Sequence, residues 1–139
     1  MAYDPADRTR ILARIVGPYL IVLGAMLLVR GPTLDLMLPA FMQDGPLVLA
    51  AGAFTLMAGL TMFALHHHWT SAPAVVLTLI AIGAALKGAM LMIAPELGAT
   101  LSVLVARTPP LLVVVALIVL VIGAWLAFVG WAAKETSAK

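Results

Sequence analysis

Long apolar runs separated by short polar stretches dominate the sequence. The hydrocarbon core of a membrane is about 30 Å thick, and a helix needs about 20 apolar residues to cross it. Four runs reach that length, at residues 11–29, 47–65, 74–93 and 111–131. They lack the alternation of apolar and polar positions that is typical of membrane β-strands. Because a helix satisfies its own backbone hydrogen bonds in lipid, the pattern predicts four transmembrane helices.

The connections between these runs differ in character. "RGPTLDLMLPAFMQDGP" and "PELGATLSVLVARTPP" mix polar and apolar residues and are interrupted by prolines. We expect each of them to hold a short helix that lies in the outer membrane interface. Only the histidine-containing connection between the second and third runs is tight. The sequence therefore predicts an all-α integral membrane four-helix bundle, in a single domain of residues 1–139, with short interfacial helices in the two outer loops.

Composition agrees with a membrane protein and excludes several other classes. Hydrophobic residues make up 64% of the chain and charged residues only 10%, and the mean hydropathy is +1.15. A soluble domain carries about 25% charged residues. The net charge of +2 includes no basic cluster of the kind that binds nucleic acid. The chain has no cysteine, which excludes disulfides and thiolate sites.

Basic residues predict the orientation. Four spans put both termini on one side of the membrane. That side holds Arg8, Arg10, Arg14, Lys134 and Lys139, whereas the other side holds Arg30 and Arg107. The positive-inside rule then places both termini in the cytoplasm. The three tryptophans fall near the same interface, where their amphipathic rings are expected to act as anchors; they are Trp69, Trp125 and Trp131.

Glycines recur every seven residues within the apolar runs. Nearly two helical turns separate such positions, so each set marks one helix face, where small residues let membrane helices approach closely. We predict that these faces pack against other helices. The glycines concerned are Gly17, Gly24, Gly52, Gly59, Gly123 and Gly130, with Gly88 in the third run sharing the phase of Ala81.

Lys87 is the one charge inside a predicted span, and an ionisable residue in a membrane helix is costly. It lies six residues before Ile93 at the outer end of the span, which is about 9 Å of helix rise. Its own stem can cover most of that distance by snorkelling. We favour an anchor at the membrane edge. The alternative is a functional charge that faces the interior of the bundle.

Three consecutive histidines, His66, His67 and His68, invite a metal or cofactor hypothesis. Metal ligands on a helix usually stand three or four residues apart on one face, whereas consecutive residues fan out by about 100°. A haem ligand would be expected within a span rather than at its edge. We therefore favour polar residues of a solvated interfacial turn. A metal site is a weak alternative, and a pH-responsive contact is another.

The sequence contains no serine–histidine–acid set, phosphate-binding loop or HExxH motif. We therefore do not expect an enzyme, a catalytic residue or a bound cofactor.

The stretches His66-His67-His68-Trp69, Lys87-Gly88 and Pro95 form a pattern that resembles a family of small bacterial integral membrane proteins with four predicted helices and no assigned activity. These proteins share a histidine–asparagine–x–tryptophan turn after the second helix and a lysine–glycine pair near the end of the third. His67 departs from the pattern by replacing the asparagine, and Ala84 stands where a tryptophan is expected. The resemblance covers residues 15–95 and implies a fold and a membrane location rather than a chemistry.

Two functions remain open. The favoured one is an accessory or structural component of the bacterial inner membrane, which acts through helix–helix contacts in a homo-oligomer or a larger complex within the lipid bilayer. The alternative is a small oligomeric transporter or channel that uses Lys87 and the His66–His68 turn. The direction of the Lys87 side chain distinguishes them, since a transport function requires it to face a space between helices.

Overall fold

The computed structural model describes residues 5–66, 69 and 71–132, and this part of the chain contains five α-helices and no β-strand. The helices are α1 (Pro5–Gln43), α2 (Gly45–Leu65), α3 (Ala72–Ile93), α4 (Pro95–Ala106) and α5 (Pro109–Ala132). All but α4 are long and apolar enough to cross a membrane. The prediction of an all-helical chain with four candidate membrane spans is therefore confirmed.

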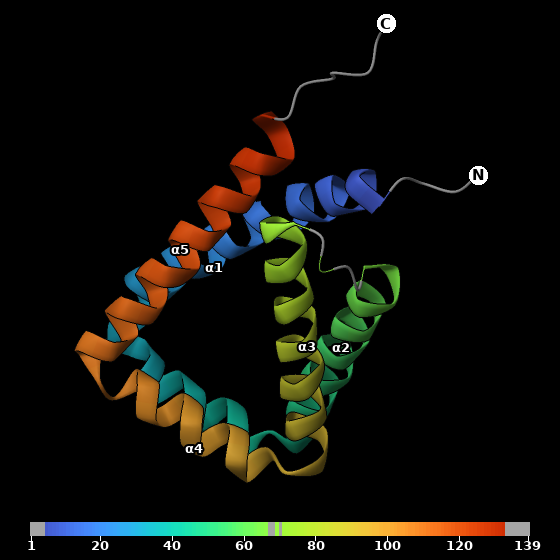
Figure 1. Ribbon diagram of the computed structural model, residues 1–139. Helices are drawn as coiled ribbons and strands as arrows, with labels where there is room; N and C mark the ends of the chain where they lie inside the picture. The colour runs from blue at the N-terminus through green and yellow to red at the C-terminus, as the bar shows by residue number, and fades with distance from the viewer. Residues whose placement is uncertain (1–4, 67–68, 70, 133–139) are drawn as a thin grey trace, which may run out of the picture.

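Helix α1 is much longer than the expected first span of residues 11–29. It contains 39 residues, which correspond to about 58 Å of helix, and it continues through the connection in which we expected a separate helix. Proline normally kinks or breaks a helix because it lacks a backbone N–H. Here Pro32 and Pro39 lie inside α1, and the hydroxyl of Thr33 donates a hydrogen bond of 2.9 Å to the carbonyl oxygen of Arg30 beside the first of them. The helix changes direction instead of ending (Figure 1).

The other helix boundaries follow local signals in the sequence. Asp44 caps α2, since its carboxylate accepts a 3.1 Å hydrogen bond from the backbone N–H of Leu47. Ser71 caps α3 in the same way, with its hydroxyl oxygen 3.4 Å from the backbone nitrogen of Ala74. Pro46 and Pro73 are the second residues of these two helices, in the first turn, where a backbone N–H has no partner within the helix.

The helices form two pairs rather than an evenly packed bundle. The first part of α1 lies along α5, and α2 lies along α3, and these two pairings hold most of the contacts between helices. The last turns of α1 run beside α4, which bridges from the end of α3 to the start of α5 (Figure 1). The arrangement resembles a triangle with one helix pair on each of two sides and α4 with the end of α1 on the third.

The two pairs meet at the end of the molecule where α1 and α3 begin and α5 ends, which we call the terminal end. A buried cluster lies there, formed by Ala13, Val16 and Leu20 of α1, Leu77 of α3 and Leu126 of α5. Val76 and Ile80 of α3 are partly buried and also pack against this cluster. The hydrophobic core thus joins the pairs at one corner of the triangle.

Candidate functional site

Glycines let the backbones of α1 and α5 approach each other closely. A Cβ atom added to Gly17 would lie 2.5 Å from the backbone nitrogen of Ala127, and one added to Gly24 would lie 3.0 Å from the carbonyl oxygen of Ala116. On the opposite helix, a Cβ atom added to Gly123 would lie 2.8 Å from the backbone nitrogen of Ile21. Any side chain at these positions would push the helices apart. Gly130 and Gly31 extend the same contact toward the two ends of the pair.

The α2–α3 pair is built in the same way. A Cβ atom on Gly59 would clash with the backbone of Ala85, and one on Gly88 would clash with the backbone of Leu56. Gly52 faces Gly88. Gly45 and Gly83 differ, because a Cβ atom at either one would meet nothing within 4 Å. The seven glycines predicted to pack against other helices therefore lie at helix contacts, whereas Gly45, seven residues before Gly52, does not.

A buried polar group lies beside the apolar cluster at the terminal end. His66, the residue that caps the C-terminus of α2, is only 1% exposed, and Thr9 of α1 and Thr78 of α3 are 8% and 0% exposed. The Nε2 atom of His66 lies 3.5 Å from the hydroxyl oxygen of Thr9. The hydroxyl of Thr78 donates to the backbone oxygen of His66 at 3.5 Å. We call Thr9, His66 and Thr78 the His66 corner; it joins three helices.

This burial differs from the solvated turn that we favoured for the histidines. His66 ends α2: its backbone N–H bonds to the carbonyl oxygen of Met62, and its imidazole lies beside Thr9 of α1. His67 and His68 lie outside the described residues. The described part of the chain contains no group of three or more histidine, cysteine, aspartate or glutamate side chains that would hold a metal ion.

Two arginines of α1 add polar contacts at the same end. Arg8 donates from Nη1 to the carbonyl oxygen of Leu65 at 3.5 Å. Arg14 donates from Nε to the carbonyl oxygen of Gly130 at 2.7 Å, and its guanidinium lies 5.6 Å from the ring centre of Trp131. These contacts use the free carbonyl groups that every helix leaves at its C-terminus. Trp69 and Trp125, the other proposed anchors, are exposed.

Lys87 lies on a face of α3 that is packed near one end and exposed further along. Val76, Ile80, Gly83 and Lys87 are spaced by four, three and four residues and therefore share one helix face. The first two pack against the cluster at the terminal end. Further along, Gly83 faces open space and Lys87 is exposed. The two helix pairs thus separate along this face, and Lys87 lies on it beyond the point of separation.

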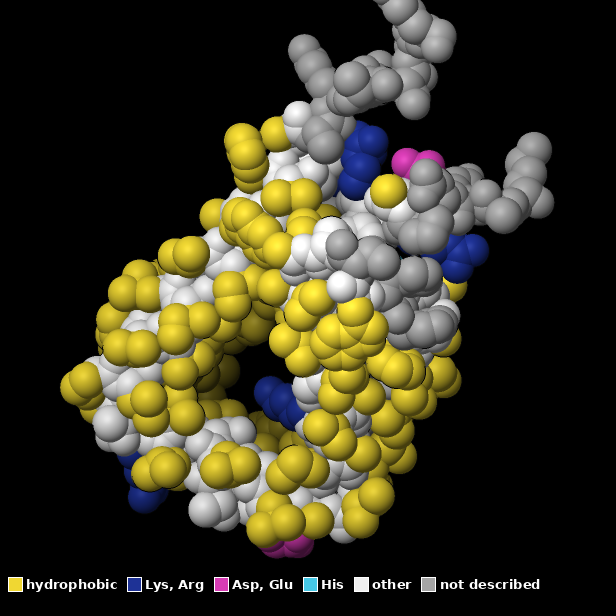
Figure 2. Space-filling view, viewed as in Figure 1, with side chains coloured by type: hydrophobic (Ala, Val, Ile, Leu, Met, Phe, Trp, Pro, Cys, Tyr) yellow, Lys and Arg dark blue, Asp and Glu magenta, His cyan; other side chains and the backbone are white. Residues whose placement is uncertain are grey.

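Figure 2 shows an opening between the helix pairs, with hydrophobic side chains on its walls and a basic side chain at its edge. Lys87 is the only basic residue of α3, the helix that borders the opening on one side. The opening is closed at both ends of the helices: the cluster and the His66 corner close the terminal end, and α4 with the last turns of α1 closes the other. It is therefore accessible from the side, along the plane in which membrane lipids would lie.

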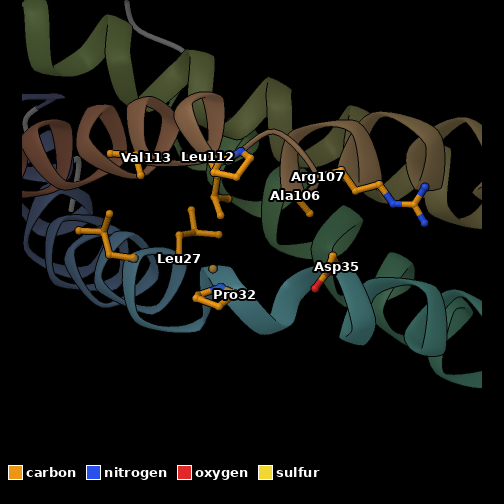
Figure 3. A pocket seen from close by; sticks show the side chains of 10 residues that line it. Leu27, Pro32, Asp35, Ala106, Arg107, Leu112 and Val113 are labelled. Atoms are coloured by element: carbon orange, nitrogen blue, oxygen red, sulfur yellow. The ribbon is translucent and has the colours of Figure 1, made fainter.

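A separate pocket of about 460 Å³ lies between α1, the end of α4 and the start of α5. Its walls are mostly apolar, with Leu27 and Leu112 among them, and Asp35 and Arg107 add one charge of each sign (Figure 3). The side chain of Arg107 extends away from Asp35 (Figure 3), so the pocket contains no paired charges.

Comparison with the models of known protein families, with curated proteins and with solved structures yields no match for this chain. The fold and its composition define the class: a helical, multi-pass membrane protein with four candidate spans. Among the described residues, the polar features that stand out are the His66 corner, Lys87 on α3 and the pocket with Asp35 and Arg107.

Proposed function

We propose that this chain is a small transport-type protein of the bacterial inner membrane, whose ligand site is the opening beside Lys87. One observation carries the proposal: Lys87 lies on the face of α3 that turns toward the other helix pair, where the two pairs have separated. A lysine within a membrane span costs about 2.5–3.5 kcal/mol on insertion scales. A role in ligand binding explains why such a charge stands beside an opening.

The shape of the opening indicates how a ligand would enter. Both ends are closed, so water has no continuous path along the helices, whereas the sides are open to lipid (Figure 2). The ligand is therefore a molecule dissolved in the bilayer. Transfer across the membrane then requires one closed end to open, and at least two copies of the chain would be needed to enclose a complete path. We place the gate at the terminal end, where the apolar cluster and the approach of His66 to Thr9 join the two pairs.

The orientation belongs to the same proposal. Arg8, Arg10 and Arg14 near the start of α1 support a cytoplasmic terminal end. On this assignment, α4 and the last turns of α1 lie at the outer interface. Lys87 then stands in the outer half of the membrane.

A spin label distinguishes an open site from one filled by protein. Because the chain has no cysteine, Gly83→Cys supplies a single attachment point in a position with open space. In proteoliposomes we expect a nitroxide at residue 83 to move freely and to collide with dissolved oxygen. A label at Phe54→Cys, on an exposed face of α2, is the reference for free motion. An immobilised label that is shielded from oxygen would contradict the proposal.

The accessory role is the second candidate. It is favoured by the sparse contact between the two helix pairs, which leaves their facing surfaces available to a helix of another protein. Purification from native membranes in mild detergent tests it. Stoichiometric recovery of one defined complex, together with an immobilised label at residue 83, would support this role over transport.

A further inference from the structure

We propose that the opening binds a long-chain carboxylate, with the carboxylate group on the Nζ atom of Lys87 and the acyl chain between the helix pairs. This inference rests on the proposed function and specifies its ligand. It follows from three properties of the opening: the sign of its charge, the apolar character of its walls and the closure of its ends.

The charge is a single positive one. The described acidic residues are Asp7, Asp35, Asp44 and Glu96, and none of them forms an ion pair with Lys87. Lys87 is exposed within the protein, but inside a membrane span its neighbours would be lipid or apolar side chains rather than water, and an unpaired charge in such surroundings is costly. A second copy of the chain has no acidic residue within the expected spans at 47–65, 74–93 and 111–131. A ligand with one negative charge meets this need.

The walls and ends restrict the rest of the ligand. Gly83, one turn from Lys87, leaves space beside α3, and the walls visible in Figure 2 are hydrophobic. A transmembrane helix is about 10–12 Å wide, whereas an acyl chain is much narrower and needs less separation of the two helix pairs. The large polar head group of a phospholipid would lose its hydration inside a closed apolar ring. A fatty acyl chain is narrow and flexible, and its carboxylate is small.

A binding measurement with matched ligands and variants tests the inference. The probes are radiolabelled oleate and radiolabelled oleyl alcohol, which differ in the charged group, and the full-length protein is used in a neutral detergent. We expect saturable binding of oleate to the wild-type chain. Lys87→Gln should weaken oleate binding by about tenfold or more, because a hydrogen bond to a charged group is lost. Oleyl alcohol should bind equally to both proteins.

Control variants separate a specific contact from general effects. Lys87→Arg should restore most of the oleate affinity, and Arg30→Gln, which removes the same charge elsewhere, should leave it unchanged. Gly83→Trp should fill the opening and weaken both probes, whereas Gly45→Trp, at the other open glycine, should affect neither. A melting curve for each variant confirms that it folds.

The outcomes distinguish this inference from the proposed function. Equal oleate binding by the wild-type chain and Lys87→Gln overturns the carboxylate contact, even if the label at residue 83 shows that the opening exists. Displacement of oleate by phosphatidylglycerol at equal concentration also overturns it, in favour of a phospholipid. Loss of binding in Gly83→Trp but not in Gly45→Trp supports the opening as the location. A shielded label at residue 83 contradicts both proposals.

Discussion

Gly52 and Gly88 face each other across α2 and α3. A Cβ atom on Gly52 would lie 3.1 Å from the carbonyl oxygen of Gly88, and a Cβ atom on Gly88 would lie 2.8 Å from the carbonyl oxygen of Gly52. Contact between bare backbones brings many atoms of both helices within van der Waals range, which is the main source of helix association in lipid. The same contact recurs between α1 and α5. Each pair thus has a continuous close contact, whereas the two pairs meet each other only near their ends.

We predict that Gly59→Leu destabilises the α2–α3 pair. A Cβ atom at Gly59 would clash with the backbone of Ala85, and backbone cannot move aside as a flexible side chain does. Overpacking of this kind costs about 1–3 kcal/mol. Thermal unfolding in detergent should show a lower midpoint, and Gly52→Leu should behave similarly.

Gly45→Leu is the matched control for these variants. It places the same side chain on the same helix, at a glycine where a Cβ atom meets nothing within 4 Å. Its midpoint should equal that of the wild-type chain. If Gly59→Leu and Gly45→Leu melted together, the close approach of α2 and α3 would not contribute to stability.

We predict that His66→Ala is strongly destabilising and that Trp69→Ala is not. The two residues lie in the same connection, but His66 is 1% exposed and Trp69 is 62% exposed. Removal of the imidazole leaves a cavity between α1, α2 and α3 and removes the contact with Thr9, at a cost of about 2–5 kcal/mol. The unfolding midpoints of the two variants measure the difference.

A double-mutant cycle isolates the polar part of this effect. Thr9→Val keeps the shape of the side chain and removes its hydroxyl, which should cost about 1 kcal/mol. In the double variant with His66→Ala, the part of this cost that comes from the contact with His66 should disappear, so the two effects should sum to less than additivity predicts. Strict additivity would show that the 3.5 Å approach of the two side chains contributes no energy.

The positions of the helices could be predicted from sequence because the bilayer imposes a simple rule of length and hydrophobicity. Residues 47–65, 74–93 and 111–131 agree closely with α2, α3 and α5. The first helix was harder to predict. Pro32 and Pro39 favour a break after residue 29, but a bent helix satisfies the backbone more completely than a loop, and α1 continues to Gln43.

The candidate site was less predictable, because it depends on how the helices pair. Nothing in the sequence states that α1 pairs with α5 and α2 with α3, and the opening exists only because of that pairing. The partners of His66 were missed for the same reason. Thr78 is a lone hydroxyl within an apolar run, and such a residue is a recognisable signal, but its contact with the backbone of His66 requires the fold.

We predict that Arg14 fixes the end of α5. Its Nε atom donates to the carbonyl oxygen of Gly130 at 2.7 Å, and its guanidinium lies above the ring of Trp131. Arg14→Lys keeps the positive charge but loses the planar donor geometry, so it should cost about 1 kcal/mol and increase amide hydrogen exchange in the last turn of α5. Arg8→Lys is the control, since Arg8 contacts α2 rather than α5. Equal exchange in both variants would contradict this role for Arg14.

We predict that the terminal end faces the cytoplasm, and single-cysteine variants of this cysteine-free chain test the prediction directly. Gly45 lies at the α4 end and Ala72 lies at the terminal end, and each residue is exposed. Gly45→Cys and Ala72→Cys therefore report on opposite ends of the molecule. A maleimide that cannot cross membranes should label residue 45 in intact spheroplasts, and it should label residue 72 only after the membrane is permeabilised. The reason is the cost of moving Arg8, Arg10 and Arg14 across the membrane, which exceeds that of moving Arg30 and Arg107. The reverse labelling pattern would place Lys87 in the cytoplasmic half of the membrane, and any carboxylate bound to it would then enter from that leaflet.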